Sequence, residues 1–342
     1  QAGSAVLERL IGETRAAGSD ILDGKDAFLL HDTYGFPLDL TREIAEEQGM
    51  GIDEAGFAAA MRQQKERARA ALRAKTTSAW DGPDGLDALG ELPPTVFTGY
   101  ERLEEQATVL LLVRTSGDND DKTIVDEASA GDQVLLVTDR SPFYAEAGGQ
   151  TGDRGVITGD GYSITVSDTR KTGAGIYLHE GKVESGTVRQ GDDARLSVDR
   201  TRRLATARNH TATHLLHKAL REVLGDHVAQ AGSAVSPERL RFDFSHYQPL
   251  TPAERSEVER LVNAAILADL SVETDLMTLE EARQSGAMAL FDDKYGDHVR
   301  VVRVGGYSRE LCGGTHLRSS SQACLFRILS EGGVASGIRR IE

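Results

Sequence analysis

Apolar and polar positions are arranged differently in three successive stretches of this 342-residue chain. The first stretch, residues 1–92, is mostly helical in pattern, and residues 53–74 consist largely of Ala and charged residues that are strong helix formers. Asp53 is expected to cap that helix. Gly and Pro within residues 80–85 then end the helix and begin a linker.

The second stretch, residues 93–195, changes to short β-rich runs that are separated by Gly and Asp. Short strands at such regular spacing favour a small β-barrel. The predicted strands are 107–115, 133–138, 162–167 and 194–198.

The third stretch, residues 196–342, mixes both patterns. It is therefore predicted to be an α+β domain, and the whole chain is placed in the α+β class. Helices are expected at 203–224 and 252–269, with strands near 239–244, 270–276, 299–304 and 323–329.

Two short motifs in the third stretch supply candidate metal ligands. His210 and His214 lie four residues apart in a run without Gly or Pro, so a helix places both imidazoles on one face. Cys312 and His316 have the same separation, and the two glycines between them allow the backbone to fold tightly. Three imidazoles and a thiolate are a donor set that tetrahedral zinc takes. We therefore expect one Zn²⁺ site.

The two histidines at 210 and 214 also allow interpretations other than a zinc site. A zinc-protease helix carries Glu directly after its first His as the general base, whereas Thr211 stands there in this chain. Two histidines on one helix are often only a polar face, but the matching Cys/His pair favours a metal. His217 lies on the same face as His210 and is an alternative ligand. Because four ligands are complete without it, His217 is expected to pack beside the site.

Composition limits the remaining possibilities. The formal charge of −15 argues against a nucleic-acid partner, but RNA responds to local fields, and five arginines between 195 and 208 precede the first metal motif. Two cysteines exclude a disulfide scaffold, and Cys324 is expected to be a small buried hydrophobe. No run of 18 apolar residues occurs, and no signal segment follows the first residues. We expect an excised piece of a cytoplasmic protein, with no membrane partner.

Several long motifs resemble those of bacterial alanyl-tRNA synthetases, occur in the order of that family and cover nearly the whole chain. The resemblance implies a β-barrel in the second stretch. The motifs include Asp-Thr-Tyr-Gly-Phe-Pro-Leu-Asp-Leu-Thr at 32–41, Phe-Tyr-Ala-Glu-Ala-Gly-Gly-Gln-Thr-Gly-Asp at 143–153, Asn-His-Thr-Ala-Thr-His at 209–214, Leu-Arg-Phe-Asp-Phe-Ser-His at 240–246, Glu-Leu-Cys-Gly-Gly-Thr-His at 310–316 and the Ser-Glu-Gly-Gly run that begins at 330.

The resemblance implies a middle fragment of such a synthetase that edits mischarged tRNA. Residues 1–92 would be a tRNA-recognition segment, 93–195 the barrel, and 196–342 an editing domain that hydrolyses Ser-tRNA(Ala) and Gly-tRNA(Ala) with zinc. Partners would be tRNA(Ala) and the rest of the parent synthetase, which ligates alanine to tRNA(Ala) using ATP. Because no class II ATP-binding motif is recognisable, the aminoacylation domain is expected to be absent.

Three residues are candidates for the chemistry of that reaction. Cys312 is a metal ligand, and Thr211 offers a hydroxyl beside the metal that could read the hydroxyl of serine. Gln230 matches a pocket glutamine of the family, although a loop amide that bonds to its own backbone is the plainer interpretation. Thr211 is the stronger candidate for reading that hydroxyl, although threonines at helical spacing are more often simply packed.

Five residues are candidates for contacts to tRNA. Asp39 could accept a hydrogen bond from a guanine amino group in the acceptor stem, or could be a helix N-cap. Gly149 lies in a Gly-rich turn that lacks the Gly-Lys-Ser/Thr ending of a phosphate-binding loop, so ATP binding is not supported there. The Gly-rich turn predicts either a simple hairpin turn or a segment that borders the binding site of the tRNA 3′ end. Arg202, Arg203 and Arg339 belong to the basic clusters.

A rival hypothesis from a different functional class is a tRNA-binding module whose zinc is purely structural. Such a module would need the metal for folding but would show no turnover of an ester. A hydrolase of unrelated small esters is a third hypothesis, and it lacks any apolar pocket signature.

Overall fold

The computed structural model describes residues 2–16, 18–34, 36–63, 92–116, 121–288 and 297–342. The chain divides into two compact units. Unit 1 comprises residues 1–82 and 333–338, and unit 2 comprises residues 83–332 and 339–342. Within the described residues, no helix is long and apolar enough to cross a membrane.

Unit 1 is helical, as its sequence pattern predicts. Its helices are α1 (Ala2–Ala16), α2 (Gly24–Tyr34) and α3 (Leu38–Glu47), with a two-residue parallel pairing of β1 (Ile21–Leu22) and β2 (Gly51–Ile52). Leu7, Ile11 and Leu30 are completely or almost completely buried in its core. Helix follows Asp53, whose carboxylate accepts the backbone N–H of Gly56 at 2.9 Å, which confirms the predicted cap. Residues 64–74 of the predicted helix, and the linker at 80–85, lie outside the described residues.

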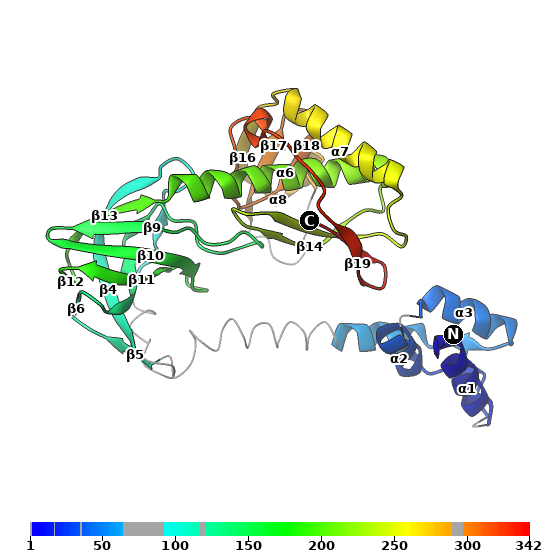
Figure 1. Cartoon of the computed structure of the whole chain (residues 1–342). Coiled ribbons are helices and arrows are strands. Elements are labelled where there is room, and N and C mark those ends of the chain that lie inside the picture. The colour runs from blue at the N-terminus through cyan, green and yellow to red at the C-terminus, as the bar shows by residue number, and fades with distance from the viewer. Residues whose placement is uncertain (1, 17, 35, 64–91, 117–120, 289–296) are drawn as a thin grey trace. The chain divides into compact units, whose positions relative to one another are not determined.

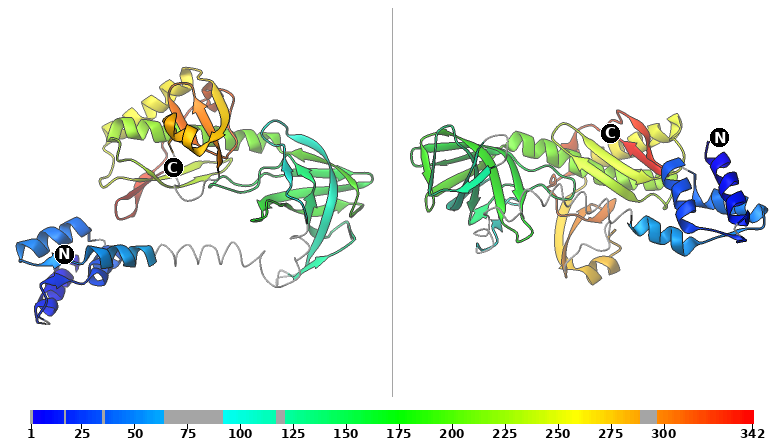
Figure 2. Two further views of the ribbon diagram at one scale, coloured as in Figure 1. Left: turned by 180° about the vertical axis from the view of Figure 1, so that it is seen from behind. Right: turned by 90° about the horizontal axis from the view of Figure 1, so that it is seen from below.

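A closed six-stranded antiparallel barrel forms the first part of unit 2 and confirms the barrel prediction (Figures 1 and 2). The strand order is β13-β9-β10-β11-β7-β4, and β13 also pairs with β4, which closes the ring. A further strand, β5, pairs with β4 outside the ring. Alternate side chains point inward and fill the barrel, among them Leu112, Leu136 and Ile157. The strands are β4 (Glu104–Ser116), β5 (Asp121–Ile124), β7 (Gln133–Thr138), β9 (Gly155–Gly159), β10 (Tyr162–Lys171), β11 (Tyr177–Ser185) and β13 (Asp193–Val198).

Two small strand pairs accompany the barrel. The strands β3 (Val96–Phe97) and β8 (Arg140–Ser141) are parallel, and β6 (Glu127–Ser129) and β12 (Thr187–Arg189) are antiparallel.

The second part of unit 2 is built around the long helix α6 (Arg200–Leu224), which begins directly after β13 and continues past β14 (Figure 1). Asp199 caps it by accepting the backbone N–H of Arg202. Leu215, Leu216 and the aromatic rings of the facing sheet are buried in the core of this part.

Helices and short sheets surround α6 and complete this part of the unit. The helix α7 (Pro252–Leu267) opens with a capping box, and α8 (Leu279–Gln284) follows β16. One sheet has the order β14-β15-β20-β19 and another β16-β17-β18. Residues 333–338, which include most of β19 and the start of β20, are grouped with unit 1. The strands are β14 (Gln230–Val235), β15 (Leu240–Ser245), β16 (Val272–Thr278), β17 (His298–Val304), β18 (Ser308–Leu311), β19 (Glu331–Ala335) and β20 (Ile338–Ile341).

Two expectations about residues 319–329 are wrong. The predicted strand at 323–329 is absent, because α7 takes its backbone donors: Asn263 Oδ1 accepts the N–H of Phe326 at 2.9 Å, and Glu259 Oε1 accepts that of Ile328 at 2.6 Å. Cys324, expected to be buried, is exposed. It ends a 3₁₀ turn with φ of 69°, so its side chain points away from the core.

Candidate metal centre

Four side chains from two distant segments converge beside α6. His210 and His214 lie one turn apart on the helix with their ring centroids 5.4 Å apart, and Cys312 and His316 lie in the loop that follows β18. One ligand atom from each residue falls within 4.8 Å of the other three. The structure therefore brings together the four predicted ligands as a group suited to hold a metal ion.

The loop from Cys312 to His316 is held in shape by contacts from outside it. Arg300 donates to the carbonyl oxygens of Cys312 at 3.0 Å and of Gly314 at 2.8 Å. The Tyr100 hydroxyl donates to the carbonyl of Gly313 at 2.6 Å, and the Arg300 guanidinium lies 4.1 Å from the Tyr100 ring centroid. A side chain at Gly314 would overlap the ring of His210, so glycine is required at that position.

Each of the three imidazoles is anchored through its Nδ1 atom. Nδ1 lies 2.7 Å from Gln150 Oε1 in His210, 2.7 Å from Glu310 Oε2 in His214 and 3.2 Å from the Thr211 hydroxyl in His316. The Nε2 atoms therefore face one another and the sulfur of Cys312, which lies 3.3 Å from Nε2 of both His210 and His316. Nε2 of His214 is buried and has no hydrogen-bond partner within the part of the chain that the structure describes. Nδ1 atoms that are anchored outside the group and Nε2 atoms that face the other ligands are the arrangement of metal-binding histidines.

Neighbouring charges shift the pKa values of Cys312 and Glu310 so that both side chains favour their ionised forms. Burial opposes ionisation of Cys312, but His210 and His316 outweigh it and hold the pKa of the thiol well below its usual range. Burial likewise opposes the charge of Glu310, and His214 outweighs it and lowers the pKa of the carboxyl to about 2. Burial disfavours protonated His214, yet Glu310 raises its pKa to about 10. These shifts favour the thiolate of Cys312, the carboxylate of Glu310 and the protonated form of His214.

His217 belongs to this network without being one of the four grouped residues. Its Nδ1 lies 3.1 Å from Oε1 of Glu310, whose other oxygen contacts His214. The side chain is 1 % exposed and its ring packs on Phe242. His217 therefore packs beside the site, as the sequence predicts.

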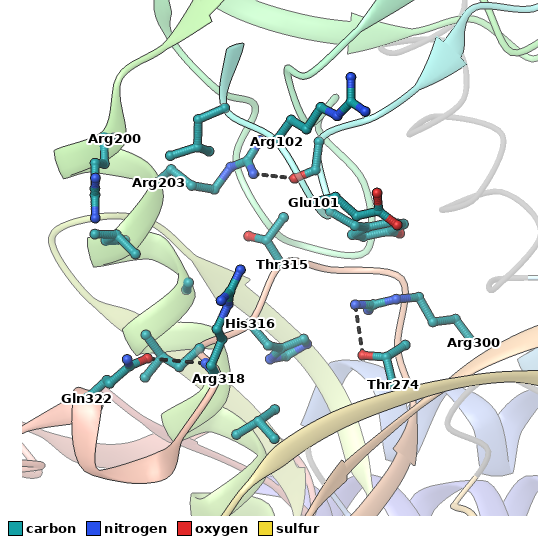
Figure 3. A pocket seen from close by; sticks show the side chains of 17 residues that line it. Glu101, Arg102, Arg200, Arg203, Thr274, Arg300, Thr315, His316, Arg318 and Gln322 are labelled. Carbon is teal, nitrogen blue, oxygen red and sulfur yellow. Dashed lines mark hydrogen bonds between the residues drawn. The ribbon is translucent and has the colours of Figure 1, made fainter. Parts of the chain in front are cut away.

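A cavity of about 600 Å³ opens next to the metal loop, with labelled arginines arranged around Thr315 and His316 (Figure 3). Among the described residues, five arginines and one carboxylate, that of Glu101, contribute to its wall. Among the residues that the structure describes, Arg200 and Arg318 have no carboxylate within ion-pair distance. The arginines are Arg102, Arg200, Arg203, Arg300 and Arg318.

Thr211 and Gln230, the residues proposed to act on the ester, differ in their contacts with the metal ligands. Thr211 is completely buried, and its hydroxyl accepts the backbone N–H of Leu317 at 3.1 Å in addition to contacting His316. Gln230 is the first residue of β14, and its amide donates to the hydroxyl of Ser233 at 3.1 Å. Thus Thr211 touches a predicted metal ligand, whereas the recorded contact of Gln230 is to its own strand.

The residues proposed for tRNA contact do not form one cluster. Asp39 belongs to unit 1, where it is the second residue of α3 and pairs with Arg42 at 3.0 Å. The N-cap of that helix is Pro37, so the alternative prediction that Asp39 caps it is wrong. In unit 2, Arg202 pairs with Glu238 at 3.4 Å.

The other three candidates for tRNA contact also lie in unit 2. Arg203 is buried, and pairs with Asp153. Gly149 has φ of 84° and packs against the backbone of Ser233, and Arg339 donates to Glu331 at 2.7 Å. The tRNA contacts therefore remain predictions for Asp39, Arg202, Arg203, Gly149 and Arg339.

Sequence reasoning missed the residues that orient the ligands. Gln150 lies in the Gly-rich turn, whose pattern predicts only a hairpin turn or a contact with the 3′ end of the tRNA. Glu310 is the first residue of the Cys/His motif. Tyr100 and Arg300 carry no recognisable signal in the sequence, because their contacts with the metal loop arise only from folding.

Comparison with known families identifies the chain. The family described as class II (A) tRNA synthetases matches residues 1–202, and the threonyl and alanyl tRNA synthetase second additional domain matches residues 299–342. The chain therefore belongs to the class II (A) tRNA synthetases. His210 and His214 lie between the two matched regions, whereas Cys312 and His316 lie within the second.

Relatives give a more particular match. The chain is 51 % identical over 340 residues to the alanine–tRNA ligase of Acetivibrio thermocellus, which covers 99 % of the chain and 38 % of that protein. It is 49 % identical to the alanine–tRNA ligase of Pelotomaculum thermopropionicum, over 99 % of the chain and 38 % of that protein. It is also 49 % identical to the alanine–tRNA ligase of Xanthomonas euvesicatoria, over 98 % of the chain and 37 % of that protein. The chain spans somewhat over a third of the length of these relatives.

These comparisons contradict the interpretation of the chain as an editing fragment without an aminoacylation region. Residues 1–202 match the class II family, so the chain includes a class II region that the sequence analysis places outside it. The C-terminal stretch matches a second additional domain. Zinc-dependent hydrolysis of Ser-tRNA(Ala) and Gly-tRNA(Ala) is therefore wrong as the function of this chain. The resemblance to alanyl-tRNA synthetases agrees with the relatives, but the part of the synthetase was misassigned.

Proposed function

We propose that this chain serves an alanine–tRNA ligase by binding tRNA(Ala) beside a structural zinc ion. The observation that carries the proposal is the cavity of about 600 Å³, whose wall combines five arginines with the metal loop. The relatives are alanine–tRNA ligases, which supplies the reaction, ligation of alanine to tRNA, and hence the partner.

Zinc is the metal that best fits the donor set. Three imidazole nitrogens and one thiolate match the N/S preference and coordination number of structural zinc, whereas calcium and magnesium prefer oxygen ligands. With four protein ligands the site is closed, so a bound ion would act by joining α6 to the loop at 312–316. The ion would thereby fix the position of Thr315 and His316 in the cavity wall.

Charge in the cavity supports a phosphate-bearing ligand. Asp153 neutralises Arg203, and Arg102 pairs with Glu105 at 3.5 Å. Arg200 and Arg318 have no such partner among the described residues, and phosphate groups bind guanidinium groups strongly. The overall charge of −15 does not oppose this binding, because the phosphates respond to the local field.

The proposal is tested by binding of a tRNA(Ala) transcript to the whole chain between about 50 and 200 mM salt. The double variant Arg200→Gln/Arg318→Gln is expected to bind more weakly and to lower the slope of log affinity against log salt by about 2, roughly one per lost phosphate contact. Arg255→Gln, an exposed arginine on α7 outside the cavity wall, is the matched control and should leave the slope unchanged.

Removal of the metal provides an independent test of the same proposal. A chelator should release near-stoichiometric zinc and weaken tRNA binding, because the loop that carries His316 loses its fixed position. Unchanged binding by both the double variant and the metal-free chain would refute the proposal.

A further inference from the structure

Gln150 is a completely buried polar side chain that joins the barrel to the metal site. It lies in the loop between β8 and β9, and its amide contacts two residues that are 60 and 165 positions away in the sequence. Neither the family matches nor the proposed function assigns it a role.

The orientation of the Gln150 amide follows from an unambiguous donor. The backbone N–H of Thr315 can only donate, and it lies 3.0 Å from Oε1. On the other side of the amide, Nε2 donates to the Thr315 hydroxyl at 2.9 Å. The oxygen of the amide, not its nitrogen, therefore faces the ring of His210.

This orientation determines the tautomer of His210. Its Nδ1 lies 2.7 Å from Oε1, which can only accept, so Nδ1 must carry the proton. Neutral imidazole then has its lone pair on Nε2, the atom that faces the other ligands. The opposite tautomer would place two lone pairs against each other inside a buried site.

The loop that carries Gln150 is fixed on both sides. The backbone of Gly149 accepts the N–H of Val235 at 2.8 Å, and Val235 accepts the N–H of Thr151 at 3.0 Å, so the loop is bound to the edge of β14. On the other side, Gly314 leaves no room for a side chain between His210 and the amide. At the barrel end of the loop, the backbone N–H of Glu146 donates to the carbonyl of Thr169 in β10 at 2.9 Å. The position of Gln150 is therefore set by the barrel and by the second part of unit 2 together.

We propose that Gln150 is a positioning residue that sets the metal-binding tautomer of His210, so that metal affinity depends on the docking of this barrel loop. The inference rests on the metal site of the proposed function but not on tRNA binding. A matched series of variants in the whole chain tests it.

Zinc affinity is measured by competition with a chromophoric chelator, and the absorption spectrum of the cobalt(II) form reports the ligand field. Gln150→Leu removes the acceptor, and Gln150→Asn keeps an amide but withdraws it by one methylene. Both should lower zinc affinity about 10- to 100-fold and change the cobalt spectrum. Gln150→Glu restores an acceptor oxygen and should stay within about threefold of the parent, given the basicity that a carboxylate lends to imidazole. Gln190→Leu, an exposed glutamine of the barrel, is the matched control and should be unchanged.

The outcomes separate this inference from the proposed function. Parent-like affinity and cobalt spectrum in a folded Gln150→Asn variant would overturn it. An equal loss in Gln150→Glu, with the fold retained by circular dichroism, would also overturn it, since rescue depends on the acceptor oxygen. A parent chain that takes up neither zinc nor cobalt would overturn both proposals. The binding of tRNA by the arginine variants tests only the proposed function and does not affect the role of Gln150.

Discussion

Nδ1 of His214 lies 2.7 Å from Oε2 of Glu310, and both side chains are almost completely buried. A carboxylate in this position fixes the orientation of the imidazole and increases its basicity as a metal ligand. The other oxygen of Glu310 contacts His217, so one carboxylate organises two histidines of α6.

Loss of this carboxylate should weaken metal binding without removing any ligand. Glu310→Gln keeps an acceptor oxygen but removes the charge, and zinc affinity is expected to fall at least about tenfold. Chelator competition measures the effect. Glu257→Gln, a half-exposed glutamate on α7 that pairs with Arg260, should behave like the parent. Equal affinities of the two variants would show that Glu310 does not act on the metal.

Zinc binding should release a proton near neutral pH. The pKa of metal-free His214 is raised to about 10, since Glu310 outweighs the effect of burial, so this imidazole is protonated at pH 7.5 and must lose its proton to bind a metal. Cys312 is already a thiolate because its pKa is lowered, and it contributes no proton. We expect about one proton per zinc. Calorimetry in buffers of different ionisation enthalpy measures this number, which should be smaller in Glu310→Gln; release of two or more protons would contradict the assignment.

Arg203 should be important for stability. It is buried, pairs with Asp153 and donates to the carbonyl oxygens of Gly99 at 2.6 Å and Pro142 at 2.8 Å, thereby holding α6 against the barrel. Arg203→Met leaves the carboxylate of Asp153 buried and unpaired, and should lower the free energy of unfolding by about 3–5 kcal/mol. Denaturant titration measures the loss. The neighbouring Arg202 forms a surface ion pair, and Arg202→Met should lower the free energy of unfolding by less than about 1 kcal/mol.

Acid should destabilise the barrel through His179. This histidine is buried between the Ser141 hydroxyl at 2.7 Å and the Leu136 carbonyl at 2.9 Å, and burial lowers its pKa to about 4. The unfolded chain binds a proton near pH 6.5 but the folded chain does not, so stability is full above pH 6.5 and falls as the pH drops toward 4.

The loss from His179 amounts to about 3 kcal/mol, from a shift of about 2.5 pH units. His179→Gln should remove this component, and the difference between parent and variant unfolding free energies, measured from pH 7 to pH 4, isolates it. Parallel pH curves would contradict the prediction.

Local patterns in the sequence predicted much of this fold. The strand at 133–138 agrees with β7, and the helix predicted at 203–224 with α6, because alternation, helical runs and flanking turn residues act over short distances. The four grouped metal residues were also recognisable, since a spacing of four on a helix places two imidazoles on one face whatever the rest of the chain does.

Relationships between distant segments could not be predicted in this way. The segment at 323–329 has the composition of a strand, yet side chains of α7 occupy its backbone donors. Arg203 has the sequence context of a surface cation, but packing of α6 on the barrel buries it against Asp153.

The metal site shows the same division. Its ligands are determined by residue type and local spacing, which the sequence carries by itself. Their orientation is decided by Gln150, Glu310 and Thr211, and the first two lie 60 and 96 positions from the histidines that they hold. A hydrogen bond depends on distance and angle in space, so only the tertiary structure, by closing the barrel loop and β18 onto α6, decides which nitrogen of each imidazole faces the metal.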